Sequence, residues 1–417
     1  MNNKLKNHYE AFYGLPNEVT FCKSCVISNQ RPSSTVEFKH KIDEKKEVIN
    51  FNTQNICSAC EYHSKKKNID WKQREELLRN LCREIKKKKT DPLQYDCVVP
   101  GSGGKDSAFA AHILKYKYGL NPLTVTWAPH LYTDIGWKNF ESWIHVGGFD
   151  NILFTPNGKL HRYLTKNAFE NLLHPFQPFI IGQRIIGPLI AQKFNVPIVF
   201  YGENQAEYGN KISENNKEIM DEKFFTSLEN VRELYIGGKK IGKMLEETNF
   251  KLEDFKPYIP LDHNFIKRNK IEVHYLGYYE KWDPQEVYYY ASENTGFKPN
   301  PDRTEGTYGR YSSIDDKIDM FHYYTTLIKF GLGRASYDAA QEIRNGKIDR
   351  AEGVNLVKLY DTEFPKKYFK DFLNYISISE NEFHNIVNKF RSPHLWGKDS
   401  SGDWKLRKNV SKNGLDD

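Results

Sequence analysis

Residues 95–107 read Tyr-Asp-Cys-Val-Val-Pro-Gly-Ser-Gly-Gly-Lys-Asp-Ser. The first six residues form a short apolar run typical of a buried β-strand, and the last residue opens a helical pattern that continues to residue 118. The glycines between them allow the backbone to wrap closely around a phosphate, where successive N–H groups and the helix N-terminus stabilise negative charge. The stretch therefore predicts an anion-binding loop between a strand and a helix.

The side chains of this loop suit a nucleotide phosphate. Lys105 can pair with a phosphate oxygen, and the hydroxyl groups of Ser102 and Ser107 can donate further hydrogen bonds. Asp106 beside a phosphate is best explained by Mg²⁺ held between them. A Walker A loop is excluded because its G-x-x-x-x-G-K-[ST] spacing is absent.

Strands and helices alternate over the next hundred residues. Further strands are expected over 123–127, 152–154 and 197–201, with helices over 137–146, 160–173 and 180–194. Strands separated by helices at this spacing predict an α/β fold, a doubly wound parallel sheet covered on both faces. In such a sheet the ligand lies beyond the carboxyl ends of the strands.

The loop closely resembles the S-G-G-x-D-S motif of the PP-loop ATP pyrophosphatase superfamily, and all six positions match over Ser102, Gly103, Gly104, Lys105, Asp106 and Ser107. The resemblance implies a HUP-like core that binds ATP and Mg²⁺ and releases AMP and pyrophosphate. It also implies that the first and fourth strands are neighbours, which would place Glu203 and Asn204 opposite the loop. Glu203 would then bind Mg²⁺ or the activated substrate.

Two more residues are candidates for ATP binding. Trp127 ends the second strand, where the superfamily places adenine, and Arg184, on the helical segment before the fourth strand, can reach a phosphate. All four residues outside the loop have an ordinary alternative role. Trp127 can be a core residue, Arg184 can have a structural role, and Glu203 and Asn204 can belong to a surface loop.

Four of the six cysteines form two C-x-x-C pairs, Cys22 with Cys25 and Cys57 with Cys60. Strand-like runs at 36–38 and 48–51 predict a hairpin that brings the pairs together, so that four thiolates can close a tetrahedral structural Zn²⁺ site. An iron–sulfur cluster, a redox dithiol and unrelated buried cysteines are the alternatives. Cys82 and Cys97 are expected in the core.

The 417 residues suggest two or three domains at about 150 residues each. We expect a zinc-ribbon-like module over 1–68, a PP-loop domain over 69–235 and a mainly helical, substrate-binding region over 236–417. A net charge of +7 is mild and dispersed, so nucleic acid is not an expected partner. The first seven residues have no apolar segment of the signal-peptide type, and no run is long enough to span a membrane, which predicts a cytoplasmic protein.

Taken together, the two cysteine pairs, the loop at 101–107, the segment Tyr201-Gly202-Glu203-Asn204 and the helical C-terminal region resemble the N-acetyl sugar amidotransferase family. These PseA-like proteins act in bacterial surface-glycan synthesis, including pseudaminic acid and lipopolysaccharide O-antigen. The resemblance implies that Lys105, Asp106 and Glu203 support conversion of an acetamido group of an acidic, often nucleotide-linked sugar into an acetamidino group, with ammonia attacking an adenylylated amide.

Ammonia must come from elsewhere, because four cysteines belong to the pairs and two are expected in the core, leaving no glutaminase nucleophile. Either free ammonia is used, or a separate subunit supplies it. The resemblance implies a partner pair similar to the glutaminase and cyclase of histidine biosynthesis.

Arg303 and Arg310 lie in a polar, glycine-containing loop, and we expect them to bind the acidic sugar, since arginine recognises carboxylates and phosphates well. A solvated connecting loop is the alternative. The main rival function is a tRNA-modifying PP-loop enzyme of the thiolase type, although Cys82 and Cys97 are poorly placed for thiolation; a non-catalytic zinc-containing binding module is a second rival.

Overall fold

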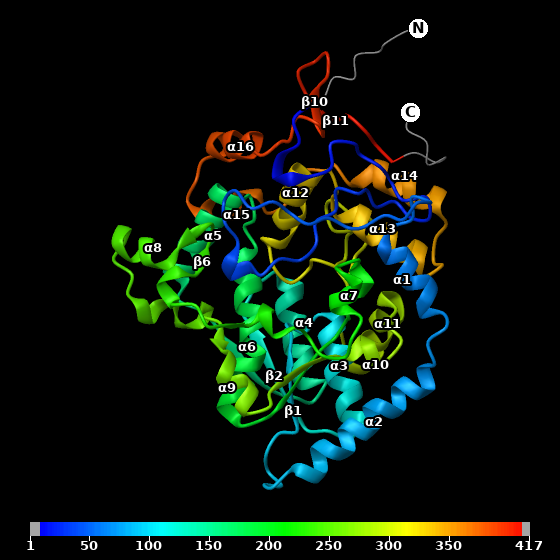
Figure 1. The fold of residues 1–417 in the computed structure, drawn as a ribbon, viewed down its shortest axis with the longest axis vertical. Helices are drawn as coiled ribbons and strands as arrows, with labels where there is room; N and C mark the ends of the chain where they lie inside the picture. Colours follow the sequence, from blue (N-terminus) through cyan, green and yellow to red (C-terminus); the bar gives the residue numbers. More distant parts are fainter. Residues whose placement is uncertain (1–8, 411–417) are drawn as a thin grey trace.

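The computed structural model describes residues 9–410 (Figure 1). It contains a five-stranded parallel sheet in the order β3-β2-β1-β4-β9. The prediction from residues 1–7 lies outside the described residues. The strands are β1 (Cys97–Pro100), β2 (Pro122–Trp127), β3 (Asp150–Phe154), β4 (Ile198–Tyr201) and β9 (Glu272–Tyr275). The expected α/β class is confirmed, and β1 pairs with β4 as predicted.

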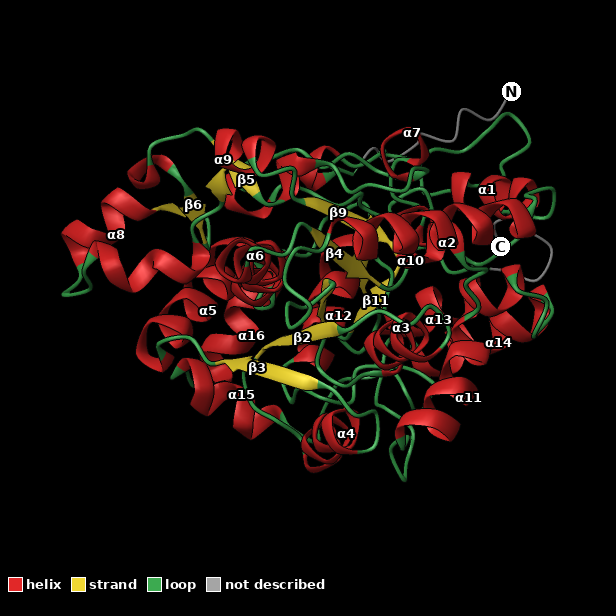
Figure 2. Cartoon of the chain, turned by 90° about the horizontal axis from the view of Figure 1, so that it is seen from below, coloured by secondary structure: helices red, strands yellow, loops and turns green. Residues whose placement is uncertain are grey.

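Helices cover both faces of the sheet (Figure 2). One face packs against α5 (Gly158–Leu172) and α6 (Gln177–Phe194), and the other against α2 (Trp71–Lys88), α3 (Lys105–Tyr116), α4 (Asp134–His145) and α11 (Pro284–Thr295). Successive residues of β1 alternate between the faces: Val98 belongs to the α6 side, whereas Cys97 and Val99 belong to the α3 side. The sheet is therefore doubly wound.

Local capping explains where two helices begin. Asp70 accepts a hydrogen bond from the backbone N–H of Gln73 at the start of α2, and Asp283 accepts two at the start of α11. In both caps the carboxylate satisfies N–H groups that have no partner within the helix.

The fifth strand was missed by the sequence analysis. Residues 272–275 lie beyond residue 235, where mainly helices were expected, yet β9 pairs with β4 in register from Ile198 opposite Glu272 to Tyr201 opposite Tyr275. The run is only four residues long and contains a glutamate and a histidine, so its pattern alone does not predict a strand. The division at residues 68 and 235 stays a prediction.

The cysteine-bearing N-terminal segment is irregular, with one helix, α1 (Ser58–Lys66). The expected hairpin strand at 36–38 is wrong: residues Glu37–Lys39 form a single 3-10 turn whose Phe38 side chain is 1% exposed. Isolated antiparallel bridges, such as Phe21 with Ser28 and Phe51 with Cys57, bring the cysteines together instead.

The C-terminal region is mainly helical, as expected. It comprises α12 (Asp319–Phe330), α13 (Arg334–Arg344), α14 (Arg350–Tyr360), α15 (Phe369–Ile376), α16 (Glu380–Lys389) and a hairpin of β10 (Trp396–Lys398) and β11 (Trp404–Leu406). The N-terminal segment lies against it: the Tyr13 hydroxyl donates to the Phe390 carbonyl at 2.8 Å.

Short elements complete the chain between β4 and α11. They are α7 (Ile212–Asn215), β5 (Thr226–Ser227), β6 (Tyr235–Ile236), β7 (Lys239–Lys240), α8 (Ile241–Glu247), β8 (Leu261–Asp262), α9 (His263–Arg268) and α10 (Leu276–Tyr279). Across residues 9–410, none of the helices is both long enough and apolar enough for a membrane span.

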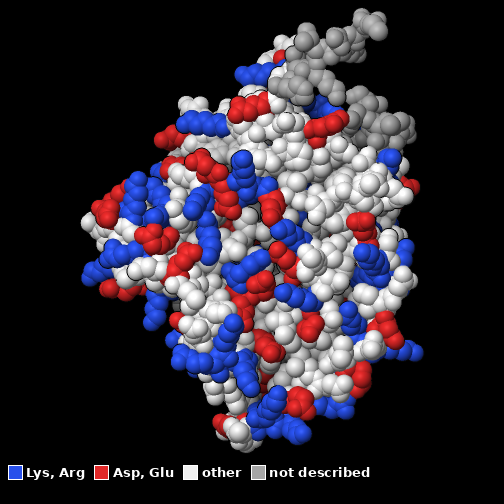
Figure 3. Space-filling model, viewed as in Figure 1, with Lys and Arg blue, Asp and Glu red and all other residues white. Residues whose placement is uncertain are grey.

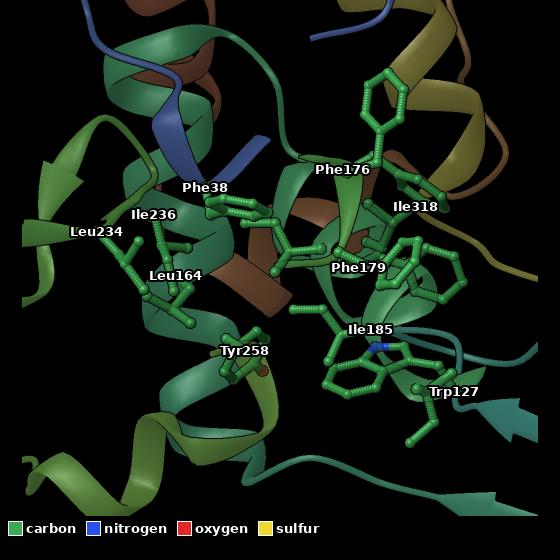
Figure 4. Packing of buried hydrophobic residues seen from close by; sticks show 14 of the residues in the cluster. Phe38, Trp127, Leu164, Phe176, Phe179, Ile185, Leu234, Ile236, Tyr258 and Ile318 are labelled. Atoms are coloured by element: carbon green, nitrogen blue, oxygen red, sulfur yellow. The ribbon is translucent and has the colours of Figure 1, made fainter. Parts of the chain in front are cut away.

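One hydrophobic cluster joins segments that are far apart in the sequence. Figure 4 shows Phe38 of the N-terminal segment, Ile185 of α6, Tyr258 and Ile318 in the same packing. Within this cluster the Trp127 ring stacks on Phe154 at 5.2 Å between centroids. The N-terminal and C-terminal segments therefore share a core with the sheet.

Gly182 of α6 provides a test of this packing. A Cβ atom there would lie 2.2 Å from the Trp127 ring, so Gly182→Ala forces the ring to move and should destabilise the protein by about 1–3 kcal/mol. Thermal denaturation followed by circular dichroism measures the effect.

The matched control is Gly158→Ala in α5, where a Cβ atom would meet nothing within 4 Å. This substitution should leave the denaturation midpoint unchanged or slightly higher. An equal midpoint for the two variants would show that α6 does not pack against Trp127 as described.

Candidate functional site

A cavity of about 550 Å³ opens at the carboxyl end of the sheet. The loop after β1 contributes Ser102, Gly104, Lys105 and Asp106 to its lining, and the loop after β4 contributes Glu203. Most of the remaining lining comes from the N-terminal segment and from residues between 283 and 347, and Asn139 and residues between 173 and 210 complete it. This edge is where doubly wound sheets place their ligands.

The glycines of the loop are required by its geometry. Gly103 has a φ of 83°, and a Cβ atom there would lie 2.8 Å from the carbonyl oxygen of Asn139. A Cβ atom at Gly101 would lie 2.1 Å from the Cβ of Ser107. Gly104 is the N-cap of α3 and has no side-chain cap, so the first N–H groups of a twelve-residue helix remain available to an anion.

Lys105 and Asp106 form an ion pair at the start of α3. The Lys105 Nζ lies 2.7 Å and 2.8 Å from the two carboxylate oxygens of Asp106, and Lys105 is 7% exposed. The Ser102 hydroxyl donates to an Asp315 carboxylate oxygen at 2.7 Å, whereas the Ser107 hydroxyl donates to the Gly104 carbonyl within the loop. Ser107 therefore supports the loop conformation and does not line the cavity.

Glu203 lies beside this pair. Burial and the neighbouring Asp106 carboxylate raise the pKa of Glu203 to about 7. A Cβ atom at the preceding Gly202 would lie 3.3 Å from the Asp106 carbonyl, which confirms that the two loops are adjacent. The carboxylates of Asp106 and Glu203 interact, and Lys105 neutralises part of their negative charge. Their oxygen atoms are donors of the kind that Mg²⁺ prefers.

The other residues expected to bind ATP differ in position. Arg184 lines the cavity, where its guanidinium group lies 4.7 Å from the Phe224 ring centroid. Asn204 is fully buried and caps the next turn by accepting from the Ala206 N–H at 2.8 Å. Trp127 is 3% exposed in the core. Neither Asn204 nor Trp127 is part of the cavity lining, so their roles in binding stay predictions.

The structure places Arg303 and Arg310 outside the cavity lining. Arg303 donates to both carboxylate oxygens of Glu363, at 2.6 and 2.7 Å, and Arg310 donates to the Asn300 carbonyl at 2.8 Å. Since these guanidinium groups hold the loop to its neighbours, the geometry does not support the expected role in substrate binding. Tyr308 and Tyr311 of the same loop line the cavity instead.

Several cavity residues were missed by the sequence analysis. Asp315, four residues before α12, lines the cavity and accepts the hydrogen bond of Ser102, and burial raises its pKa. Arg334 of α13 lines the same cavity and pairs with Asp338 at 2.9 Å. The only local signal was a group of acidic residues at a helix start, which is equally typical of a cap.

The two cysteine pairs meet as expected. All four Sγ atoms lie within 4.8 Å of one another, with Cys22–Cys60 at 3.9 Å and Cys25–Cys57 at 3.7 Å. Four sulfurs around Zn²⁺ at about 2.3 Å would be separated by about 3.8 Å, so the donor set fits a structural zinc ion. The backbone N–H of Cys57 donates to Cys22 Sγ at 3.3 Å. Such hydrogen bonds stabilise a thiolate.

The other two cysteines are core residues, as predicted. Cys82 is 3% exposed and Cys97 is fully buried. Burial raises the pKa of Cys82 to about 12 and that of Cys97 well above its usual value. Both thiols are therefore poor nucleophiles.

Comparison with known proteins finds a family match in the C-terminal region of the chain. Residues 305–411 match the family described as the C-terminal domain of WbpG-like LPS biosynthesis proteins. An uncharacterized protein of Methanocaldococcus jannaschii, MJ1599, is 36% identical over 88 residues, which cover 19% of this chain and 27% of that relative's length.

Two solved structures align with the chain at 14% identity. NMN synthetase from Francisella tularensis has a TM-score of 0.29, with 75% of this chain and 98% of that chain covered. NH3-dependent NAD synthetase from Campylobacter jejuni, in complex with the nitrate ion, has a TM-score of 0.26, with 55% and 94% covered.

Removal of one zinc ligand should abolish metal binding. Cys25→Ser leaves three thiolates, so zinc measured by plasma mass spectrometry should fall from about one ion per chain to well below that, with a lower denaturation midpoint. Cys82→Ser, a buried cysteine outside the cluster, should retain the zinc. Full zinc in the Cys25→Ser protein would contradict a four-cysteine site.

Substitution of Gly103 should disable the loop without unfolding the protein. Gly103→Ala combines a strained φ with a backbone clash, so ATP affinity measured by calorimetry should fall by about tenfold or more. Gly306→Ala is the control, since its φ is 81° but a Cβ atom there meets nothing within 4 Å. Similar ATP affinities for the two variants would argue against the loop as the phosphate site.

Proposed function

We propose that this chain, whose residues 305–411 match WbpG-like LPS biosynthesis proteins, is an ATP-dependent amidotransferase that converts an acetamido group of an N-acetylated acidic sugar into an acetamidino group. One observation carries the proposal. A single cavity is lined both by the PP-loop residues Lys105 and Asp106 and by residues of the WbpG-like region, such as Arg334. ATP and the sugar can therefore meet there.

The reaction takes place in two steps. The amide oxygen of the acetamido group attacks the α-phosphorus of ATP, and the bond to the β-phosphate breaks, releasing pyrophosphate. Ammonia then attacks the imidoyl carbon, AMP leaves with the former amide oxygen, and loss of a proton leaves C=NH in place of C=O. Neither step changes an oxidation state, so the reaction needs no redox cofactor.

The residues of the loop stabilise the charge that develops on the leaving pyrophosphate. The N–H groups at the start of α3 and the Lys105 ammonium group face negative phosphate oxygens in a partly desolvated site, where such interactions are strong. Asp106 and Glu203 would hold Mg²⁺, which supplies further charge neutralisation to the phosphates.

Ammonia is supplied from outside the chain in this proposal. Four cysteines form the zinc cluster and the other two are buried, so none of the cysteines lies in the cavity as a glutaminase nucleophile. We propose a separate glutaminase with an ammonia-conducting partner, similar to the pair of histidine biosynthesis, and a cytoplasmic reaction that prepares a sugar for surface polysaccharide.

No observation favours the rival tRNA-thiolating enzyme. Its chemistry needs an accessible cysteine, and both cysteines outside the cluster are buried with raised pKa values. Lys, Arg, Asp and Glu side chains are interspersed across the face seen in Figure 3, whereas a nucleic-acid site needs a concentrated basic surface.

The test is ATP turnover with ammonium chloride across a panel of N-acetylated acidic sugars, with bulk tRNA as the rival substrate. We expect sugar-dependent AMP and pyrophosphate, and mass spectrometry should detect a sugar in which NH replaces oxygen. Lys105→Ala should lower the rate by on the order of 10²–10³-fold, since it removes charge from the phosphate site.

Lys138→Ala is the matched control, because this exposed lysine lies on the neighbouring helix α4 and outside the cavity lining. It should retain the full rate. Turnover with tRNA alone would overturn the sugar assignment, and AMP formation unaffected by Lys105→Ala would overturn the role of the loop.

A further inference from the structure

A second group of charged residues lines the cavity away from the PP-loop. It consists of three histidines and two lysines around one glutamate, and we call it the basic cluster: Glu37, His40, Lys46, His174, His322 and Lys329. These residues come from three separate parts of the chain, the N-terminal segment, the α5–α6 connection and α12. None of them belongs to a sequence motif.

The hydrogen bonds of the cluster leave its lysines without a carboxylate. Glu37 lies 3.4 Å from His40 Nδ1 and 3.6 Å from His174 Nε2, so its two oxygens face the two imidazoles. Lys46 Nζ lies 2.6 Å from His40 Nε2, and Lys329 Nζ donates to the Leu172 carbonyl at 2.7 Å. Within residues 9–410, neither lysine has a carboxylate oxygen within 4.0 Å.

The positive charge is therefore buried without full compensation. Lys329 is 5% exposed and Lys46 is 9% exposed. Burial, with a further contribution from Lys46, lowers the pKa of Lys329 to about 7. Burial also lowers the pKa of His322 well below its usual value, and its Nδ1 has no hydrogen-bond partner in this structure. An uncompensated buried cation costs free energy, which an entering anion would recover.

The cluster is separate from the phosphate site. Among the described residues, its side-chain hydrogen bonds, ion pairs and ring contacts run within the cluster and to Tyr13, Thr35, Leu172, Phe176, Tyr323 and Phe330, and none reaches the PP-loop. Lys105 pairs instead with Asp106. The cluster and the PP-loop are therefore two distinct charged groups in the lining of one cavity.

We propose that the basic cluster binds the anionic group of the second substrate, a carboxylate or a phosphate, with Lys329 and Lys46 as the binding charges. The identification of that substrate as a sugar rests on the proposed function, whereas the anion site itself does not. Arg31, which lines the same cavity and is 4% exposed with no carboxylate within 4.0 Å among the described residues, extends the positive surface. The cluster thus takes the role that the sequence analysis expected of Arg303 and Arg310.

The test is calorimetry at pH 6.5 without ATP, using three probes: N-acetylneuraminic acid for the carboxylate, UDP-N-acetylglucosamine for the phosphate, and neutral N-acetylglucosamine. We expect an anionic probe to bind at least tenfold more tightly than the neutral one. Lys329→Met, which keeps the length of the side chain, should weaken that binding tenfold or more. Lys370→Met, at an exposed position of α15 outside the cavity lining, should not.

The pH dependence gives a second readout. Lys329 faces Lys46, Tyr13 and Glu37 of the N-terminal segment, His174 of the α5–α6 connection and His322 of its own helix, and Arg334 acts on His322. Lys329, whose pKa is about 7, gains its charge as the pH falls through this range, whereas the pKa values of His174 and His322 are lowered and these imidazoles do not drive the change. Glu37 stays ionised because its pKa is lowered. Affinity for the anionic probe should therefore rise as the pH falls from 8.5 to 6.5, and this rise should be smaller in Lys329→Met.

Each outcome decides the proposal. Binding of only the acid, only the UDP-sugar or both identifies a carboxylate, a phosphate or either group as the ligand. Equal binding of charged and neutral probes, or unchanged anion binding by both Lys329→Met and Lys46→Met, overturns it. Lys46→Met replaces Lys329→Met if the latter has a lowered denaturation midpoint. ATP turnover that fails with every sugar, while anion binding persists, would count against the proposed function alone.

Discussion

The cavity depends on the packing of the N-terminal segment against the C-terminal helices across the carboxyl edge of the sheet. A parallel sheet presents its loops at this edge but supplies no walls above them. Here Phe38 enters the main core, Tyr13 bonds to Phe390, and Arg350 of α14 donates to the backbone carbonyls of Cys22 and Cys25. The four-cysteine cluster stabilises the conformation of this irregular segment. Although the cluster does not line the cavity, it thereby supports the part of the cavity wall that the N-terminal segment forms.

Burial acts in opposite directions on the two charged parts of the cavity. Near the PP-loop it raises the pKa values of carboxyl groups such as Glu203 and Asp315, because desolvation disfavours their ionised forms. In the basic cluster it lowers the pKa of Lys329 for the same reason. A divalent cation with phosphates would relieve the first set, and an anionic substrate the second. The electrostatics thus suit two different charged ligands in one cavity.

Local sequence patterns predicted the elements whose signals are confined to a few neighbouring residues. The loop at 101–107 and the first four strands of the sheet are of this kind. Patterns failed where long-range contacts decide. β9 is a strand because β4 offers it an edge, and Glu37–Lys39 is a turn because Phe38 reaches the core. The sequence predicted that Arg303 binds an anionic substrate, but in the structure its guanidinium group donates to Glu363, sixty residues away.

The sequence by itself determined the residues of the candidate phosphate-binding loop and the composition of the four-cysteine cluster. Glycine spacing, a lysine and an aspartate at a helix start, and four cysteines in two pairs each carry their meaning within a short stretch. Only the tertiary structure decided which other side chains line the same cavity. Glu37, His174 and Lys329 are each more than a hundred residues from the next and follow no shared spacing. They meet because hydrophobic packing brings three segments together. Hydrophobic packing is non-directional, so the sequence of one segment alone does not predict which other segments it packs against.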